Sequence, residues 1–342
     1  MTDQGRLDEA YERLRDTGPE FNGWLANHGP MAADAILRLG HHEHLHAWLD
    51  AYLQRLQEPP AARWRLDRDE WREVLGDPSR LGDWRVLFDE EVREEGWQAI
   101  LVRWWPRLLP GAAASAAHGL IRTGHAVRAL REHETGPRRH ELAEALAYWA
   151  ARWQPLPAPT RARGTARLPE ALDGLPAVPP VGGFRTRLAA VTDTPTWPAA
   201  VGALPEVVDP RAVPTALDAL VDAAVDRYLL WGRASPIMLV HSATAPRAAG
   251  LVLPSLPEEH WPATYQAAWA VTAAIGSAYR PLHTPPAPAD QRSMTDAASR
   301  AVALGDEHAI KFVETAAESH NRGNRNAAAA SNLAVDWIAD DE

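Results

Sequence analysis

The chain has 342 residues and a mass of 37.5 kDa, enough for one large domain or two ordinary ones. Its 45 acidic and 35 basic residues give a net charge of −10, which disfavours nonspecific binding to nucleic acid or anionic membranes. Cysteine is absent, so disulfides, thiolate nucleophiles and cysteine-ligated metal sites are excluded, and any metal must bind nitrogen and oxygen. The polar start of the chain and the lack of an apolar stretch of about 20 residues favour a soluble, cytoplasmic protein.

Apolar residues recur at helical spacing far more often than they alternate, and β-branched residues are sparse, so the sequence predicts an all-α protein. In the first half the predicted helices span 7–15, 30–39, 45–56, 68–75, 84–105, 112–133 and 138–151. In the second half they span 185–191, 198–203, 212–230, 235–253, 261–278 and a helical segment within 290–320. The last stretch, 321–342, mixes small residues with an acidic end, and its tail is expected to fray.

Prolines and glycines crowd into residues 154–184, which are predicted to form a long irregular loop. The prolines there are Pro155, Pro157, Pro159, Pro169, Pro176, Pro179 and Pro180. Composition alone leaves open whether this loop links two domains or crosses a single fold. No glycine-rich phosphate-binding motif opens a helix, so a Rossmann or P-loop nucleotide site is not expected.

Lys311 is the only lysine among the 35 basic residues, the other 34 being arginine. Arginine stays protonated at physiological pH, whereas lysine can become a neutral amine that is open to covalent modification. Chance is an equal alternative: a GC-rich coding bias that replaces lysine by arginine could leave a single lysine with no special role. His308 lies three residues before Lys311 and therefore shares a helical face with it. Carbon dioxide could convert this lysine to a carbamate, an anionic oxygen ligand for a metal.

The remaining histidines fall into groups that differ in how strongly they indicate a functional site. His41, His42, His44 and His46 are predicted to form a solvated cluster at a helix start, because no strand precedes them as in an amidohydrolase barrel. His118, Arg122 and His125 are spaced to lie on one face of a helix that looks buried, either as a core polar network or around a metal. His28 precedes a helix start and His241 follows an apolar run, and each alone is weak evidence of a site.

Ordered blocks over most of the chain resemble the questin oxidase-like family, whose members act on aromatic polyketides, chiefly anthraquinones. These blocks are NHGPMAADAILRLG, RLGDW, WWPRLLPG, HGLIRTGHAVRAL, VHSAT and GDEHAIKF. The resemblance implies a single all-α catalytic domain over 1–342, with the Pro-rich loop beside its site. It also implies mononuclear nonheme iron held by four histidines and a carboxylated lysine. At the matching motif positions these ligands are His28, His118, His241, His308 and Lys311.

His125 and Arg122 differ from the pattern of the fungal relatives, in which the corresponding residues are tyrosine and histidine. They remain catalytic candidates: His125 as a rival ligand or an acid/base, and either residue as a group that orients a phenolate or carbonyl. The fifteen tryptophans could line a flat aromatic pocket, although most, including Trp104 and Trp105, are expected to be core.

The reaction implied by the resemblance uses Fe(2+) and O2 to cleave a ring carbon–carbon bond with a Baeyer–Villiger-like outcome. The substrate, or a separate reductant such as NADPH, would supply the electrons. No nucleic-acid or membrane partner is expected, and a homodimer is one possible assembly. Two other readings stay open: a zinc hydrolase that uses the same histidines, and a noncatalytic protein that binds an aromatic metabolite.

Overall fold

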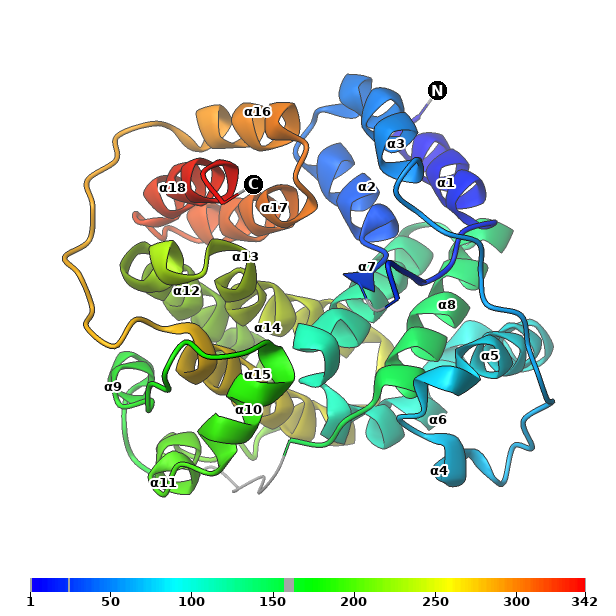
Figure 1. Cartoon of the computed structure of the whole chain (residues 1–342), viewed down its shortest axis with the longest axis horizontal. Coiled ribbons are helices and arrows are strands. Elements are labelled where there is room, and N and C mark those ends of the chain that lie inside the picture. Colours follow the sequence, from blue (N-terminus) through cyan, green and yellow to red (C-terminus); the bar gives the residue numbers. More distant parts are fainter. Residues whose placement is uncertain (1, 24, 157–162, 342) are drawn as a thin grey trace. The chain divides into compact units, whose positions relative to one another are not determined.

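The computed structural model describes residues 2–23, 25–156 and 163–341, and within them it is helical apart from one two-stranded sheet (Figure 1). The prediction of an all-α protein is therefore confirmed. By its internal contacts the chain divides into two compact units: unit 1 comprises Met1–Pro155 with Leu251–Pro257, and unit 2 comprises Leu156–Gly250 with Glu258–Glu342. A single catalytic domain over 1–342 therefore stays a prediction.

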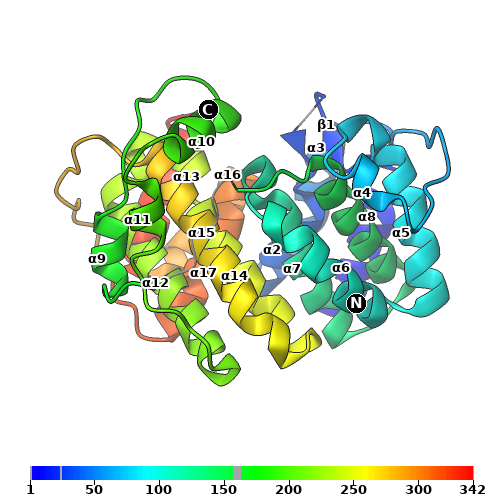
Figure 2. The ribbon, with the colours of Figure 1, turned by 90° about the horizontal axis from the view of Figure 1, so that it is seen from below.

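Unit 1 is a bundle in which α8 packs against both α5 and α7, and Figure 2 shows α5 and α8 side by side. Its core includes the buried indoles of Trp104 and Trp105, which meet Trp84 and Trp149 edge to face with ring centroids 5.5 Å apart in each pair. Both are core residues, as expected. The helices are α1 (Asp3–Leu14), α2 (Gly29–Arg38), α3 (Leu45–Leu53), α4 (Trp71–Val74), α5 (Leu81–Glu95), α6 (Trp97–Leu108), α7 (His118–Glu132) and α8 (Gly136–Arg152). The strands are β1 (Glu20–Phe21) and β2 (Leu25–Ala26), paired antiparallel.

Unit 2 is built around α12, which packs against α15, α17 and α18. Tyr228 of α12 packs against Phe312 of α17 and Trp337 of α18 with tilted rings, their centroids 4.3 and 5.8 Å away, so aromatic side chains join these helices. The helices are α9 (Leu168–Asp173), α10 (Phe184–Thr192), α11 (Trp197–Val201), α12 (Val213–Trp231), α13 (Pro236–Leu239), α14 (His241–Val252), α15 (Trp261–Tyr279), α16 (Met294–Leu304), α17 (Glu307–Asn321) and α18 (Ala327–Ala339). The last two residues of α14 are assigned to unit 1.

Long predicted helices are broken where a glycine adopts a positive φ. Gly96, at φ 85°, separates α5 from α6 within 84–105, and Gly305, at φ 80°, separates α16 from α17 within 290–320. Residues with a Cβ rarely adopt this conformation, so the chain turns at glycine and the helix restarts. Because apolar residues keep a helical spacing on both sides of each glycine, the sequence pattern did not predict these two breaks.

The irregular segments are shorter than the sequence suggests. Most of 321–342 is helical, because α18 packs against α12, α16 and α17. The helix ends at Ala339 and the exposed Asp340 and Asp341 follow it, so fraying of the tail stays a prediction. The Pro-rich segment is irregular only in part: Pro169 is the second residue of α9, in the first helical turn, where a backbone nitrogen has no helical hydrogen bond to lose. Pro157 and Pro159 of that segment lie outside the described residues.

A search for membrane-spanning segments was negative. Within the part of the chain that the structure describes, each helix is too short or too polar to cross a bilayer.

Candidate metal centre

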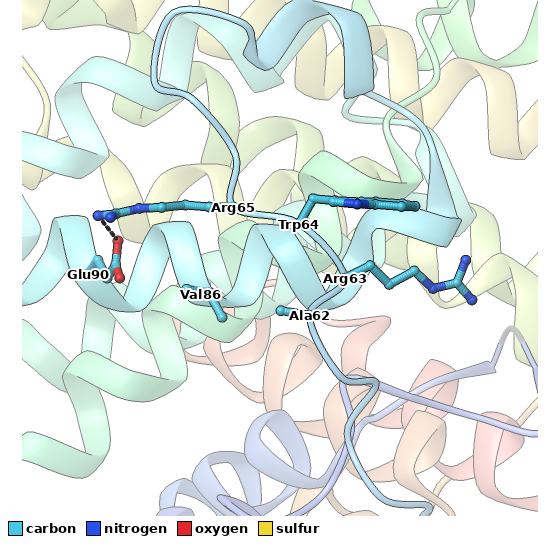
Figure 3. Close-up of a pocket in the computed structure, with 6 residues that line it drawn as sticks. All are labelled: Ala62, Arg63, Trp64, Arg65, Val86 and Glu90. Atoms are coloured by element: carbon cyan, nitrogen blue, oxygen red, sulfur yellow. Dashed lines mark hydrogen bonds and ion pairs between the residues drawn. The ribbon is translucent and has the colours of Figure 1, made fainter.

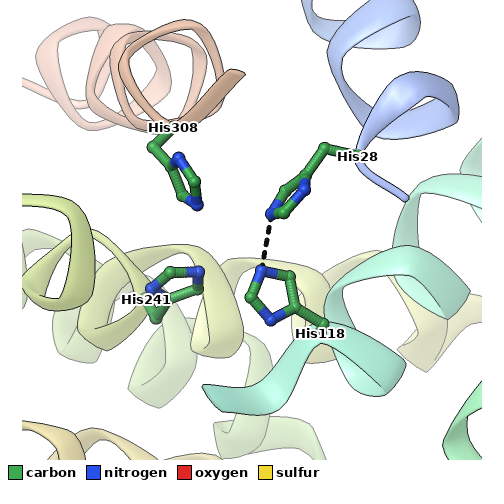
Figure 4. Close-up of side chains that lie close together, drawn as sticks. All are labelled: His28, His118, His241 and His308. Carbon is green, nitrogen blue, oxygen red and sulfur yellow. Dashed lines mark hydrogen bonds between the residues drawn. The ribbon is translucent and has the colours of Figure 1, made fainter. Parts of the chain in front are cut away.

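The first pair of histidines, His28 and His118, lies inside unit 1. Their Nε2 atoms are 2.7 Å apart and their rings meet edge to face, with centroids 4.5 Å apart (Figure 4). Both side chains are buried. Two imidazole nitrogens this close in a buried place can share a proton or, after losing it, bind one metal ion.

The NHG motif explains how His28 is held at the start of α2. Asn27 anchors the turn, since its amide donates to the Gly18 carbonyl and its Oδ1 accepts from the backbone N–H of Gly29. A Cβ on Gly29 would lie 2.7 Å from a methyl of Leu14, so a larger residue there would force the Leu14 side chain of α1 to move. The backbone N–H of His28 donates to the Tyr52 hydroxyl at 2.7 Å.

His118 follows a left-handed turn that no sequence pattern predicted. Ser115, Ala116 and Ala117 all have positive φ, at 49°, 54° and 68°. Left-handed backbone costs roughly 1–2 kcal/mol for each residue that carries a Cβ, so the turn is strained. It directs the Ser115 carbonyl at His118 Nδ1, which donates a hydrogen bond to it. Because Nδ1 carries that proton, the Nε2 of a neutral His118 presents a lone pair toward His28.

The second pair, His241 and His308, lies inside unit 2. Their ring centroids are 5.4 Å apart and the rings meet edge to face. His241 is fully buried at the start of α14, and its Nδ1 donates to the Met238 carbonyl at 3.1 Å. This contact to the third residue upstream matches that of His118, so His241 also keeps Nε2 as a possible ligand atom. Asp306 caps α17 by accepting from the backbone N–H groups of His308 and Ala309, which fixes the helix turn that carries His308.

Lys311 lies on α17 one turn after His308, and its side chain is only 1% exposed. Its Nζ has no hydrogen-bond partner among the residues that the structure describes. Burial lowers the pKa of this amine to about 7, although the carboxylates of Glu307 and Asp306 act in the opposite direction. Near neutral pH a large fraction of Lys311 is therefore the neutral amine, the form that can react with carbon dioxide.

Arg122 and His125 of α7 both engage carboxylates within unit 1. Arg122 forms a buried two-point ion pair with Glu141 at 2.6 and 2.7 Å, while its Nη1 has no hydrogen-bond partner among the described residues. His125 Nδ1 lies 2.9 Å from Oδ2 of Asp34. Sequence reasoning missed Glu141 and Asp34, although an aspartate inside the apolar run GPMAADAIL was a visible signal.

Unit 1 also carries a surface histidine cluster and a surface hollow, apart from His28 and His118. His41, Glu43 and His44 could together hold a metal, but Glu43 and His44 are exposed, as expected for a solvated cluster. A surface hollow of about 240 Å³ is lined by Ala62, Arg63, Trp64, Arg65, Val86 and Glu90, and the exposed indole of Trp64 extends away from the ion pair of Arg65 and Glu90 (Figure 3). It shares no residue with the histidine pair.

Each unit thus contributes one pair of imidazoles, a donor type that suits a metal ion. A comparison with curated proteins gave no match. Residues 25–178, which are 154 of the 342, match the family described as Questin oxidase-like. The matched range contains His28 and His118, whereas VHSAT and GDEHAIKF lie beyond it. This match over residues 25–178 confirms the resemblance of the chain to the questin oxidase-like family.

Proposed function

We propose that the protein is a nonheme iron(II)-dependent oxygenase that cleaves a ring carbon–carbon bond of an anthraquinone-type aromatic polyketide in secondary metabolism. In this proposal His28, His118, His241, His308 and carboxylated Lys311 hold one iron, and the two units act as one catalytic domain. The observation that carries it is the combination of two imidazole pairs with a buried lysine amine that has no hydrogen-bond partner in the described part of the chain.

The donor chemistry supports iron. Imidazole suits divalent iron, and one anionic oxygen ligand beside neutral nitrogens would partly balance the charge of the ion. His118 and His241 each donate Nδ1–H to a backbone carbonyl, the arrangement that commonly orients metal-bound histidines. Bound iron(II) would supply the activation of dioxygen that the ring cleavage requires.

Lys311 supplies the least common part of this donor set. An ammonium has no lone pair, whereas the neutral amine can attack carbon dioxide, form an N–C bond and release one proton to give a carbamate. An unpartnered polar group in the interior costs about 1–3 kcal/mol, and a carbamate bound to a metal would remove that cost. The burial of Nζ is what makes this position suitable for the modification.

The protein's own groups would orient the substrate. Arg122 lies one helical turn after His118, and its Nη1, which no described residue contacts by a hydrogen bond, would donate to a phenolate or ring carbonyl. Insertion of one oxygen atom beside that carbonyl leaves the second atom to be reduced to water. The two electrons would come from a hydroquinone form of the substrate or from an external reductant such as NADPH.

The central test is metal content and oxygen dependence in the wild-type protein and in Lys311→Arg. We expect one iron per chain in the wild type and loss of iron and activity in the variant, because a guanidinium retains the positive charge but forms no carbamate. A carbamate carbon resonance after exposure to ¹³C-labelled carbon dioxide should appear only in the wild type.

Three outcomes would contradict parts of the proposal. Full iron content and activity in Lys311→Arg would exclude the carbamate ligand. Turnover without oxygen, with zinc bound, would indicate a hydrolase. Absence of metal after purification with and without added iron would favour a binding protein for an aromatic metabolite.

A further inference from the structure

A buried carboxylate joins the two helices that carry the first histidine pair. Asp34 lies in the middle of α2 and is 1% exposed. Its Oδ2 accepts from two residues of α7: His125, through Nδ1 at 2.9 Å, and Arg128, through Nε at 3.0 Å and Nη2 at 2.5 Å. Arg38, on the same helix as Asp34, adds a contact to Oδ1 at 3.3 Å.

The charges of this cluster keep Asp34 ionised. Burial by itself would raise the pKa of the carboxyl, but Arg128, His125 and Arg38 outweigh it and hold the pKa well below its usual range. A buried carboxylate with several charge-assisted hydrogen bonds is a rigid connection, because breaking any one of them leaves a buried charge poorly solvated.

The position of the cluster along the helices matters more than its strength. His28 caps α2 six residues before Asp34, and His118 starts α7 seven residues before His125. The same pair of helices is therefore joined at two levels about two turns apart: by the histidines at one level and by the carboxylate cluster at the other. Because α2 and α7 are joined at two levels, neither helix can rotate about one contact without breaking the other.

We propose that Asp34, His125 and Arg128 form a positioning clamp that sets the spacing of α2 and α7 at which His28 and His118 bind one metal ion. This inference rests on the metal site of the proposed function. It gives His125 a role that is neither ligand nor acid/base: its Nδ1 is directed to Asp34, and Arg128 Nη2 lies 3.1 Å from the same nitrogen.

The first test compares Asp34→Asn with Asp83→Asn, using metal-free full-length protein. Asp83 is also a buried carboxylate of unit 1, but it accepts from Arg80 and from the backbone N–H groups of Arg63 and Trp64, far along the chain from α2 and α7. Both variants should lower the midpoint of thermal unfolding. In a titration with Co(II), Asp34→Asn should bind about 10–100-fold more weakly than wild type, as is typical when a group that orients metal ligands is lost. Asp83→Asn should bind within about twofold of wild type.

The second test separates positioning from ligation at His125. The side-chain amide of Asn can replace Nδ1 as the donor to Asp34, whereas Leu cannot. We expect His125→Asn to retain the wild-type Co(II) absorption spectrum and most of the affinity, and His125→Leu to lose both. If His125 were a ligand or an acid/base, the Asn variant would fail as the Leu variant does, or would lose a limb of the pH profile.

The outcomes distinguish the two proposals. Wild-type affinity in Asp34→Asn, equal weakening by Asp83→Asn, or failure of His125→Asn would overturn the clamp while leaving the metal site intact. A wild-type protein that binds no metal would overturn the proposed function and the clamp together.

Discussion

The two compact units each carry one pair of imidazoles, but they hold it by different means. In unit 1, His28 and His118 are accompanied by a strained left-handed turn and by the buried ionic cluster around Asp34. In unit 2, His241 and His308 lie at the starts of two helices with ordinary backbone, and the neighbouring polar group is a lysine whose Nζ lacks a hydrogen-bond partner among the described residues.

The two units therefore offer different properties: fixed side-chain geometry in unit 1 and a chemically modifiable amine in unit 2. Strain and buried charge in unit 1 fix the orientation of two rings in advance, at a cost in stability that the rest of the unit must offset. Unit 2 instead retains a group whose chemistry can change, since a buried amine without a partner is destabilising until it is modified or bound. Preorganised geometry and adaptable chemistry are therefore supplied by separate parts of the chain.

The largest expected effect comes from removing one imidazole from each unit. If the two pairs hold a single ion, His118→Ala and His241→Ala should each abolish binding of the whole metal equivalent, with an affinity loss greater than about 100-fold. Metal analysis of the purified variants measures this, and His44→Ala, in the exposed cluster, serves as the control that should keep full metal. If instead each variant lost only part of the metal, each unit would hold an ion of its own, and the proposal of one shared metal site would be wrong.

The next effect should separate stability from metal binding at Lys311. Lys311→Met keeps a long, flexible side chain but removes the buried amine, so the metal-free protein should gain about 1–3 kcal/mol in its free energy of unfolding. The same variant should lose metal affinity, because no carbamate can form. Chemical denaturation and metal titration of one preparation give both quantities, and a loss of stability with unchanged metal content would argue for a purely structural lysine.

The smallest effect tests the strain that distinguishes unit 1. Ala116, at φ 54°, and Ala243, inside α14, are both buried alanines, so replacing either by glycine removes a buried methyl group and adds freedom to the unfolded chain. Only Ala116→Gly also relieves left-handed strain, and it should therefore cost about 1–2 kcal/mol less than Ala243→Gly. Equal costs in urea unfolding would mean that the turn before His118 is not strained.

The candidate ligands could be named from sequence mainly through the family resemblance of the motifs NHG, HGL, VHSAT and HAIK, since His28 and His241 were each weak evidence alone. Lys311 also stood out as the only lysine. The structure brings the four histidines into two pairs. The partners of Arg122 and His125 could not be found in this way. Glu141 lies 19 residues from Arg122 and Asp34 lies 91 residues from His125, so only the packing of helices reveals the pairs.

By itself the sequence determined the helical class and the available chemistry. Apolar spacing is a local property, and a chain without cysteine can offer a metal only nitrogen and oxygen as strong ligands. The tertiary structure decided which nitrogen of His118 and His241 carries a proton, which charges pair in the interior, and how deeply Lys311 is buried. Each of these depends on the fields and contacts of residues distant in the chain, and for that reason a lone lysine becomes a buried amine with a lowered pKa only after the helices of unit 2 pack around it.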